Sequence, residues 1–510
     1  MPIDSPKLIR AWPPRPGAAL AALVVLGLAV FYLLTLREGH DWGGDFAMYL
    51  QHAQNIAEGR PYAQTASIPE GVGPPSYPPL LPLALAPTFA LRGGLDWTMA
   101  KATVILFFAA FLLVVYAVMR RRLGDGRALG VVLALGLSPY FWGIKDQVLS
   151  DIPFAFFAYL SLFLAESAYD EKSSFRRRIG LTLATGSVIY LASATRAVGV
   201  TLVLTLIAFE LLRFRRLPVQ ALAAAALVLA LQSVQRTALG STGGYMHSWR
   251  FDAPAIIDRV FAYPVELKYL FWNGYVNGIA VAVALIVSAL AIYGYVTCLR
   301  QRITLFEIFV VIYLGPVILW PMRPNVRFMI PLAPLYFYYA LVGMGQLRSK
   351  LPARTASRAA AALAALIAGS YVAGYASADH GRLKDGVHDP ESVALFQYVS
   401  DSAAPDDLYI FFKPRVLSFF SGARSAVSYF PAADSELWGY YDRVGATHVI
   451  ERVGDADSEA LVATHPEAFI IVYENADFRV HRIDRPSNVP TGESVDHTEP
   501  GEADPQAANA

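Results

Sequence analysis

The chain is poor in cysteine, in charge and in metal-binding motifs, and each shortage argues against a class of protein. Cys298 is the only cysteine among 510 residues, so no internal disulfide can form. No Cys/His pattern has metal-ligand spacing; the sequence predicts no cofactor and no metal-ligating residue, and leaves the need for a divalent ion open. The formal net charge of +1 offers no basic surplus for a phosphate backbone, which argues against nucleic acid as a partner.

Apolar residues, by contrast, are abundant. Hydrophobic residues make up 55% of the chain and charged residues 16%, with a mean hydropathy of +0.40. This balance is too apolar for one soluble domain and is typical of a polytopic membrane protein. We predict an α-helical membrane domain at residues 1–377 with about eleven transmembrane helices, from the length of its apolar runs. These runs lie near residues 17–36, 97–119, 127–144, 148–168, 178–195, 197–212, 218–235, 273–299, 303–320, 326–347 and 356–377.

Clusters of basic residues fall in alternate loops of this pattern. They lie at residues 120–122, 176–178, 213–216, 300–302 and 348–358, all loops of one parity. Because cytoplasmic loops carry an excess of Lys and Arg, this parity places the N-terminus in the cytoplasm and the chain after about residue 378 outside. We therefore predict a multi-pass protein of the cell (inner, cytoplasmic) membrane with an extracytoplasmic C-terminal domain.

The composition changes after about residue 378, where apolar runs shorten and charges become frequent. Alternating patterns predict a small α/β domain at residues 378–485. Its predicted elements are helices at 391–402, 415–421 and 435–444, strands at 408–413 and 447–453, and a closing hairpin of 468–474 and 478–483. The domain contains no glycine-rich phosphate loop, nucleophile elbow or histidine pair, which favours an accessory role. Residues 486–510 are rich in Pro, Gly and acidic residues and are predicted to be disordered.

The stretch from Asp41 to Tyr62 follows the first apolar run and brings two carboxylates into a predicted external loop. Gly43 and Gly44 break the chain, Asp45 is a good helix N-cap, and Gly59 is expected to end the helix. Spacings of three and four residues place Asp45, Met48, Tyr49, His52 and Ile56 on one face of this helix. Two interpretations remain: Asp45 only caps the helix and Asp41 is solvated, or the two carboxylates carry chemistry. After the turn at 76–79, residues 80–91 are expected to form either a short interfacial or re-entrant helix or a simple loop packed on the bilayer surface.

Few other ionisable residues lie on the predicted external side. Asp151 opens the fourth apolar run, where it either caps a helix or completes an external acidic site. Its neighbours Lys145 and Asp146 can form a local ion pair. Arg196, Arg323 and Arg327 either extend to the membrane interface or bind a lipid phosphate through the planar guanidinium fork.

Four motifs, in this order, resemble landmarks of the GT-C superfamily of glycosyltransferases. They are Gly43-Gly44-Asp45-x-x-x-Tyr49 with the helix end at 57–62, Tyr77-Pro-Pro-Leu-Leu-Pro82, Ser150-Asp-Ile-Pro153 and Arg327-Phe-Met-Ile-Pro331. The chain is similar to the bacterial branch that includes relatives of the dolichyl-phosphate-mannose protein mannosyltransferases and the aminoarabinose transferases. The resemblance covers about the first 345 residues.

The resemblance implies a sugar donor on a polyprenyl phosphate and an external acceptor, which is an envelope glycan, a lipid or a protein. It implies that Asp45 is the catalytic carboxylate, acting as a general base on an acceptor hydroxyl. The protein mannosyltransferases carry an Asp-Glu pair here, whereas Phe46 follows Asp45, which argues against a protein acceptor handled in the same way. The predicted substrate-binding residues are Asp41, Tyr49, Tyr77, Asp151, Arg196, Arg323 and Arg327.

Two other functions compete with glycosyl transfer as explanations of this sequence. A transporter or flippase of lipid-linked sugars needs many spans, but it should carry ionisable groups near the middle of its spans. Glu166, Glu210 and Glu307 instead lie near predicted cytoplasmic ends, which favours an enzyme at one interface. A structural or assembly protein of the cell envelope predicts that Asp45 is replaceable, and the sequence leaves that alternative open.

Overall fold

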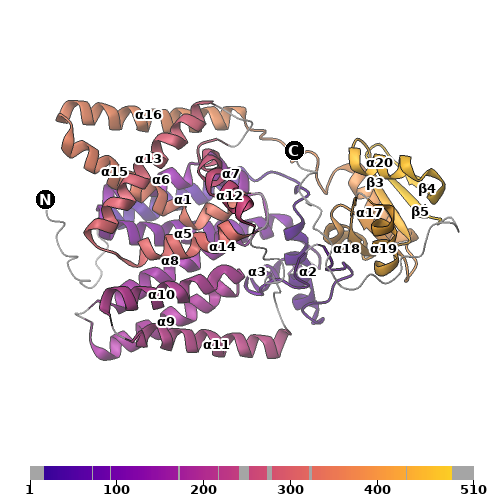
Figure 1. The fold of residues 1–510 in the computed structure, drawn as a ribbon, viewed down its shortest axis with the longest axis horizontal. Helices are drawn as coiled ribbons and strands as arrows, with labels where there is room; N and C mark the ends of the chain where they lie inside the picture. Colours follow the sequence, from indigo (N-terminus) through magenta and orange to yellow (C-terminus); the bar gives the residue numbers. More distant parts are fainter. Residues whose placement is uncertain are drawn as a thin grey trace. The chain divides into compact units, whose positions relative to one another are not determined.

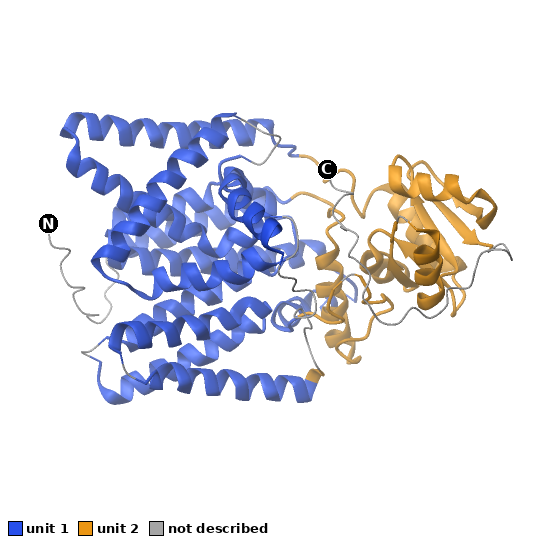
Figure 2. Ribbon diagram, in the orientation of Figure 1, with its two compact units in different colours: residues 1–36, 78–238, 248–380 blue, residues 37–77, 239–247, 381–510 orange. Residues whose placement is uncertain are grey.

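The computed structural model describes most of the chain and divides it into two compact units. The described residues are 16–71, 73–91, 93–170, 173–215, 217–240, 252–272, 278–320, 324–431 and 433–484. One unit, here called the helical unit, comprises residues 1–36, 78–238 and 248–380; the other, the α/β unit, comprises 37–77, 239–247 and 381–510 (Figure 2). The predicted site residue Arg323 and the predicted disordered tail 486–510 lie outside the described residues.

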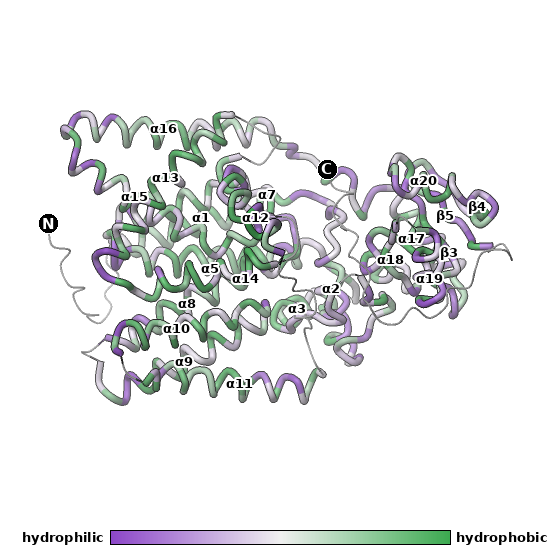
Figure 3. Tube along the Cα trace, in the orientation of Figure 1, coloured by the Kyte–Doolittle hydropathy of each residue, from purple (hydrophilic) through white to green (hydrophobic). Residues whose placement is uncertain are grey.

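The helical unit confirms the predicted class of polytopic helical membrane protein. Eight of its described helices are long and apolar enough to cross a membrane (Figure 3). Its elements are α1 (Pro16–Leu34), α3 (Leu80–Leu85), α4 (Pro87–Ala90), α5 (Trp97–Leu123), α6 (Asp125–Gly136), α7 (Pro139–Ile144), α8 (Asp151–Ala168), α9 (Phe175–Ser193), η1 (Ala197–Gly199), α10 (Val200–Phe214), α11 (Val219–Leu239), α12 (Ala253–Glu266), η3 (Leu267–Leu270), α13 (Gly278–Gln301), α14 (Leu305–Leu319), η4 (Val326–Leu332), α15 (Ala333–Lys350) and α16 (Ala353–Ser377) (Figure 1).

Each of the eleven predicted apolar runs contains helix in its described part, although three differ from the eight long apolar helices. α9 has 19 residues but begins with a basic cluster, and α14 has 15 residues. The run at 127–144 is divided into α6 and α7, because Ser138 and Pro139 interrupt it and a proline at the first position starts a new helix. The predicted short helix at 80–91 is present as α3 and α4.

Opposite ends of α8 carry two different sets of charges. At its C-terminal end, Glu166 pairs with Arg121 and Arg122 from the end of α5, at 3.4 Å for Arg121. At its first residue, Asp151 pairs with Arg196 and Arg327. The two carboxylates are fifteen positions apart, which is roughly 22 Å of helix at about 1.5 Å per residue. The basic cluster at 120–122 and the Asp151 group therefore belong to opposite ends of this helix.

The α/β unit contains a five-stranded mixed sheet in the order β2-β1-β3-β5-β4. β1 pairs in parallel with β2 and β3, and the antiparallel β5 joins β3 to β4. The bounds are α2 (Gly44–Glu58), α17 (Pro390–Ser402), β1 (Leu408–Phe411), α18 (Pro414–Ser421), β2 (Arg424–Val427), α19 (Asp434–Val444), β3 (His448–Arg452), α20 (Ala456–Thr464), η5 (Pro466–Ala468), β4 (Phe469–Glu474) and β5 (Phe478–Ile483). All elements predicted for this part are present, and β2 and α20 are additional.

Side chains on β1 alternate between two apolar layers, as the two-residue period of a strand requires. Leu408 and Ile410 belong to a core with Trp438 and other residues of α19. On the other face, Trp42 packs against Phe411, with the ring centroids 5.9 Å apart. Trp42 also packs edge-on against Phe396 of α17 and Phe478 of β5. A residue of the first loop is therefore part of the core of the C-terminal sheet.

Backbone hydrogen bonds join the first loop to the same unit at a second place. The Ile68 amide donates to the Ser425 carbonyl at 2.8 Å, and the Ser425 amide donates to the Ala66 carbonyl at 3.3 Å. Residues 66–68 thus extend the edge of the sheet beside β2. The predicted domain boundaries at 377 and 485 stay a prediction, and the described contacts add residues 37–77 to the C-terminal part.

Candidate functional site

Asp45 lies in the first turn of α2 and binds a tyrosine rather than capping the helix. The helix begins at Gly44, and its N-cap Gly43 makes no side-chain capping bond, so the prediction that Asp45 is the cap is wrong. The Tyr77 hydroxyl instead donates a hydrogen bond of 2.7 Å to Asp45 Oδ1. The N-cap and the first helical residue lie two residues earlier than expected, which places Asp45 inside the first turn. Its predicted end is confirmed, because Gly59 has a left-handed backbone with φ 68°.

Tyr77 is held from several sides by α2 and by the chain that folds back on it. Its amide donates to His52 Nε2 at 3.2 Å, and its carbonyl accepts from the Tyr62 hydroxyl at 2.7 Å. Its ring packs against Tyr49, with centroids 4.9 Å apart. The predicted face of α2 is therefore confirmed for Asp45, Tyr49 and His52, which all contact one residue.

His52 is neutral in this arrangement. A backbone amide can only donate, so the Nε2 atom that faces the Tyr77 amide carries no proton. Burial lowers the pKa of His52 to about 4, and the charge of Arg415 also lowers it. The side chain is fully buried, so a protonated imidazole is unfavourable here.

Arg415 and Lys413 of the α18 segment bring positive charge to the first loop. Arg415 donates through Nη1 to the Tyr77 hydroxyl and through Nη2 to the Pro74 carbonyl, the latter at 3.1 Å. Burial lowers the pKa of Lys413, and the charges of Asp45 and Asp41 oppose that shift. These two basic residues were not predicted as site residues. A short helix was expected at 415–421, but its partners lie more than three hundred residues away in the sequence.

Asp41 shapes the loop in front of α2. Its Oδ1 accepts the Gly43 amide at 3.0 Å and lies 3.1 Å from His40 Nδ1. His40 is buried and packs against Phe46, with ring centroids 4.0 Å apart. The Asp41 side chain is 40% exposed, as expected for a solvated loop residue, and its carboxylate also organises the turn that starts the helix.

A second charged group lies within the helical unit, and we call it the guanidinium clamp: Asp151, Arg196 and Arg327. Asp151 Oδ1 lies 2.9 Å from Arg196 Nη1, and Asp151 Oδ2 lies 3.1 Å from Arg327 Nε. The Asp151 side chain is 3% exposed, while the two arginine side chains are 21% and 23% exposed. The helix α8 has Ser150 as its N-cap, without a side-chain capping bond, so the interpretation of Asp151 as a cap is wrong. The three side chains together carry two formal positive charges and one negative charge.

The chain segments that carry the clamp are ordered by local hydrogen bonds. Asn325 caps η4 by accepting the Arg327 amide at 2.9 Å, and Arg196 donates to Ser150 Oγ at 3.1 Å. The Leu80 amide donates to the Ala194 carbonyl at 2.8 Å, which joins the start of α3 to the chain segment just before Arg196. The predicted Lys145–Asp146 ion pair is confirmed at 2.8 Å and is buried.

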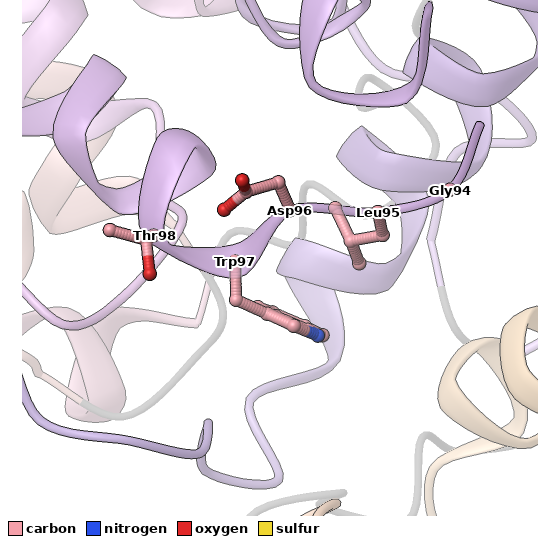
Figure 4. Close-up of a pocket in the computed structure, with 5 residues that line it drawn as sticks. All are labelled: Gly94, Leu95, Asp96, Trp97 and Thr98. Carbon is pink, nitrogen blue, oxygen red and sulfur yellow. The ribbon is translucent and has the colours of Figure 1, made fainter. Parts of the chain in front are cut away.

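Other parts of the described structure offer less chemistry. A pocket at residues 94–98 opens at the start of α5 (Figure 4). Its acidic residue Asp96 accepts the Met99 amide at 3.0 Å as the helix cap, and none of the predicted site residues lines it. Across the described ranges, no three His, Cys, Asp or Glu side chains are grouped so as to hold a metal ion.

Comparison with solved structures shows a GT-C fold. ArnT from Cupriavidus metallidurans in the apo state matches with a TM-score of 0.56 and 15% identity over 91% of this chain and 97% of that chain. The same protein bound to undecaprenyl phosphate matches with a TM-score of 0.55 and 16% identity over the same shares. The predicted resemblance is thereby confirmed for the fold.

Two other glycosyltransferase structures share this fold. The oligosaccharyltransferase AglB from Archaeoglobus fulgidus, in complex with an inhibitory peptide and a dolichol-phosphate, has a TM-score of 0.56 and 13% identity over 87% of this chain and 70% of that chain. The arabinofuranosyltransferase AftD from Mycobacteria has a TM-score of 0.57 and 14% identity over 94% of this chain and 40% of that chain. No protein-family model matches the chain, and no curated protein matches it in sequence.

Proposed function

We propose that the protein is an integral-membrane glycosyltransferase that moves a sugar from a polyprenyl phosphate to an extracytoplasmic acceptor. The acceptor is the hydroxyl group of an envelope glycan, a lipid or a protein, and the sugar is a hexose or a pentose. The GT-C fold supports this proposal, because two similar structures contain undecaprenyl phosphate or a dolichol-phosphate. The observation that carries it is the Asp45 carboxylate held by Tyr77 at the start of α2.

Asp45 is the proposed general base. The acceptor hydroxyl attacks the anomeric carbon, its proton passes to Asp45, and the bond between that carbon and the phosphate oxygen breaks. Tyr77 has one hydroxyl proton, and Arg415 can only donate to its oxygen, so that proton points to Asp45. Asp45 Oδ1 thus acts as an acceptor, which is the state that a base requires. We propose that Tyr49 and Asp41 line the same substrate site, Tyr49 through its ring and Asp41 through the turn at Gly43.

In this proposal the guanidinium clamp binds the lipid phosphate, with Arg323 as a further candidate from the sequence. The leaving phosphate carries negative charge, and a preorganised guanidinium stabilises such charge more than water does. Asp151 fixes both arginines while neutralising only one of their charges. Their partial exposure leaves them open to a ligand, whereas Asp151 is covered.

A transporter of lipid-linked sugars finds no support in the described helices. The three glutamates that were candidates for a transport path are engaged near helix ends. Glu166 pairs with Arg121 and Arg122, and Glu210 accepts from the Tyr169 hydroxyl at 2.7 Å and the Ala221 amide at 2.6 Å. Glu307 closes the capping box of α14 with Thr304. The capping box stabilises the start of α14, and the other two glutamates are paired with residues of neighbouring helices or loops.

The proposed location is the cell (inner, cytoplasmic) membrane. The N-terminus and the basic loops face the cytoplasm, and residues 37–77 and those after 378 face the other side. The two charge groups at opposite ends of α8 support this orientation, because one end carries the basic loop clusters.

The decisive test of this function is Asp45→Asn. The amide oxygen still accepts the Tyr77 hydrogen bond, and no helix cap is lost because Asp45 is not the cap. The amide does not accept a proton, so transfer from a polyprenyl-phosphate sugar should fall about 10²–10⁴-fold. The measurement is single-turnover sugar transfer by purified protein in detergent or nanodiscs, with a panel of donor sugars.

Asp96→Asn is the matched control, because it changes a carboxylate that caps a helix and was not predicted as a site residue, and asparagine caps equally well. It should keep the wild-type rate. A fully active Asp45→Asn protein with a normal melting temperature means that Asp45 is not the base. A wild-type protein that transfers none of the donors contradicts the proposed function itself.

A further inference from the structure

The C-terminal part of the α/β unit reaches the Asp45 site with a buried arginine. Arg415 is 6% exposed and follows Pro414, the first residue of α18. Its two terminal nitrogens donate to the Tyr77 hydroxyl and the Pro74 carbonyl, and its guanidinium lies 4.8 Å from the Tyr77 ring centroid. Because α18 also packs on α2, this arginine is fixed against the helix that carries Asp45.

The hydrogen bonds of this group can run in only one direction. Arginine has donors and no acceptor, so the Tyr77 oxygen accepts from Arg415. The tyrosine then has a single proton, which it gives to Asp45 Oδ1. A chain of this kind is polarised by its charged end and orients the group at the other end. His52 and Tyr62 hold the Tyr77 backbone, so the ring stays in place between Arg415 and Asp45.

We propose that Arg415 is a positioning residue of the Asp45 carboxylate, acting through the Tyr77 hydroxyl, so that the C-terminal α/β unit is part of the catalytic apparatus. This inference rests on the proposed function, because it assigns Arg415 to the base of that reaction. It replaces the predicted accessory role of the C-terminal domain. Lys413 adds a second basic group; burial lowers its pKa, and the nearby charges of Asp45 and Asp41 oppose that lowering.

The test is a double-mutant cycle of Tyr77→Phe and Arg415→Met. Each single change should slow sugar transfer roughly 10–100-fold, the range for a catalytic group displaced by about 1 Å. If Arg415 acts through Tyr77, the double variant should be no slower than the slower single variant, because the second change removes nothing further. Arg415→Lys should recover only part of the rate, since an ammonium cannot reproduce the planar fork.

Arg443→Met is the matched control from the same unit. Arg443 also joins the C-terminal part to the first loop, through Glu70 at 2.9 Å, but both side chains are largely exposed. An exposed ion pair contributes little, so this variant should keep its rate and its melting temperature. The inference is overturned if the rate losses of the two single variants multiply in the double variant. A normal rate in a folded Arg415→Met protein overturns it as well.

A second readout needs no sugar transfer. Coupling of Asp45 to glycine amide by a water-soluble carbodiimide, followed by mass spectrometry across pH, reports how readily this carboxylate protonates. Removing the Arg415 guanidinium or the Tyr77 hydroxyl disfavours the carboxylate form of Asp45. The pH of half-maximal coupling should therefore be higher in Arg415→Met and in Tyr77→Phe than in the wild type. A purely structural role of Arg415 leaves this midpoint unchanged, which overturns the inference. A shifted midpoint without sugar transfer in the wild type contradicts the proposed reaction but not the coupling.

If Arg415→Met does not fold, Arg415→Lys and Tyr77→Phe carry the same test. Both keep a side chain of similar size in place, and the midpoint of carbodiimide coupling remains measurable in each. Equal midpoints in these two variants and the wild type overturn the inference.

Discussion

At the scale of single residues, the neutral His52 makes the α/β unit sensitive to acid. The pKa of His52 is lowered to about 4 by burial, below the ordinary value of 6.5. Between these two values the unfolded chain binds the proton more readily than the folded protein. The contribution of neutral His52 to the free energy of unfolding is therefore complete above about pH 6.5 and is lost as the pH falls toward 4. The free energy of unfolding changes by roughly 3 kcal/mol over that range.

His52→Gln should remove this acid sensitivity. A glutamine oxygen still accepts the Tyr77 amide but does not titrate, so the melting temperature of the variant should vary less between pH 6.5 and 4.5. Thermal unfolding in detergent, followed by tryptophan fluorescence, measures the difference. The exposed His380 offers a control, because His380→Gln should leave the pH profile of the wild type unchanged. Identical profiles for His52→Gln and the wild type contradict the neutral buried imidazole.

Arg327 offers a test of the guanidinium clamp. In Arg327→Lys the charge remains, but an ammonium cannot hold Asp151 and a phosphate through one planar group. Losing one hydrogen bond to a charged group should weaken binding of polyprenyl phosphate roughly 10–100-fold. Binding to the purified protein in nanodiscs is the measurement, and Arg302→Lys, an exposed residue in a basic loop, is the control. Equal affinity of Arg327→Lys and the wild type removes Arg327 from the phosphate site.

At this scale the sequence predicted the residue types better than their partners. Asp45, Asp151 and the arginines were predicted as site residues from their positions at turns and helix starts, where few charged groups occur, and Tyr77 was predicted from the motif at 77–82. Arg415 was not found, because it lies 338 residues from Tyr77 and only the tertiary fold brings them together. Local pattern suggested that Asp45 and Asp151 are caps, and in both cases tertiary partners bind the carboxylate instead.

At the scale of elements, two glycines allow α13 and α15 to cross closely. A Cβ atom on Gly294 would lie 1.9 Å from the Tyr339 carbonyl oxygen, and one on Gly343 would lie 2.1 Å from the Leu290 carbonyl oxygen. Both obstacles are backbone atoms, which side-chain rotation cannot relieve. The helices must therefore separate to admit even one methyl group.

Gly294→Ala should consequently destabilise the protein by at least roughly 1–3 kcal/mol, the usual cost of overpacking. Gly345→Ala is the matched control on α15, because no heavy atom lies within 4 Å of its added Cβ. Alanine also has the better helix propensity, so this control should be neutral or stabilising. Melting temperatures of the two variants in the same detergent give the comparison, and equal values contradict the close crossing.

Elements with a strong local signal were predicted, and those without one were not. Apolar runs identify membrane spans because their length matches the thickness of the hydrocarbon core of the bilayer. The predicted C-terminal helices and strands have a clear periodicity. β2 is a four-residue strand that starts with Arg424 and Ser425, and it exists through its pairing with β1. α20 has nine residues, its apolar residues do not gather on one face, and it packs on β3. Neither β2 nor α20 has a residue pattern from which local propensity predicts a strand or a helix.

At the scale of the whole molecule, the chain returns to its first loop after all its spans. The buried Trp42, the bridge at Ser67 and the bond from Arg415 to Tyr77 all join residues 37–77 to the C-terminal part. From the sequence, the first loop and the C-terminal part are predicted as separate regions, because contacts between residues so far apart in the chain leave no periodic signal. The parity of the basic loops, however, predicted that residues 37–77 and the C-terminal part lie on the same side, which these contacts require.

The orientation itself is the remaining prediction, and the single cysteine makes it testable. In a Cys298→Ser background, new cysteines at the exposed positions Ala394, Gln301 and Ser349 report one site each. A membrane-impermeant maleimide applied to intact cells with a permeable outer layer should label Ala394→Cys. It should label Gln301→Cys and Ser349→Cys only after the membrane is opened, because both lie beside basic clusters that favour the cytoplasm.

Labelling of all three sites after detergent treatment is the control for accessibility, and the cysteine-free protein is the control for background. If Ala394→Cys is protected in intact cells while Gln301→Cys is labelled, the protein has the opposite orientation. The Asp45 site, which shares a unit with Ala394, would then face the cytoplasm, and the proposed transfer to an extracytoplasmic acceptor would be contradicted. Protection of both sites in intact cells would instead require an even number of spans between Gln301 and Ala394, one more or one fewer than the three that the sequence predicts.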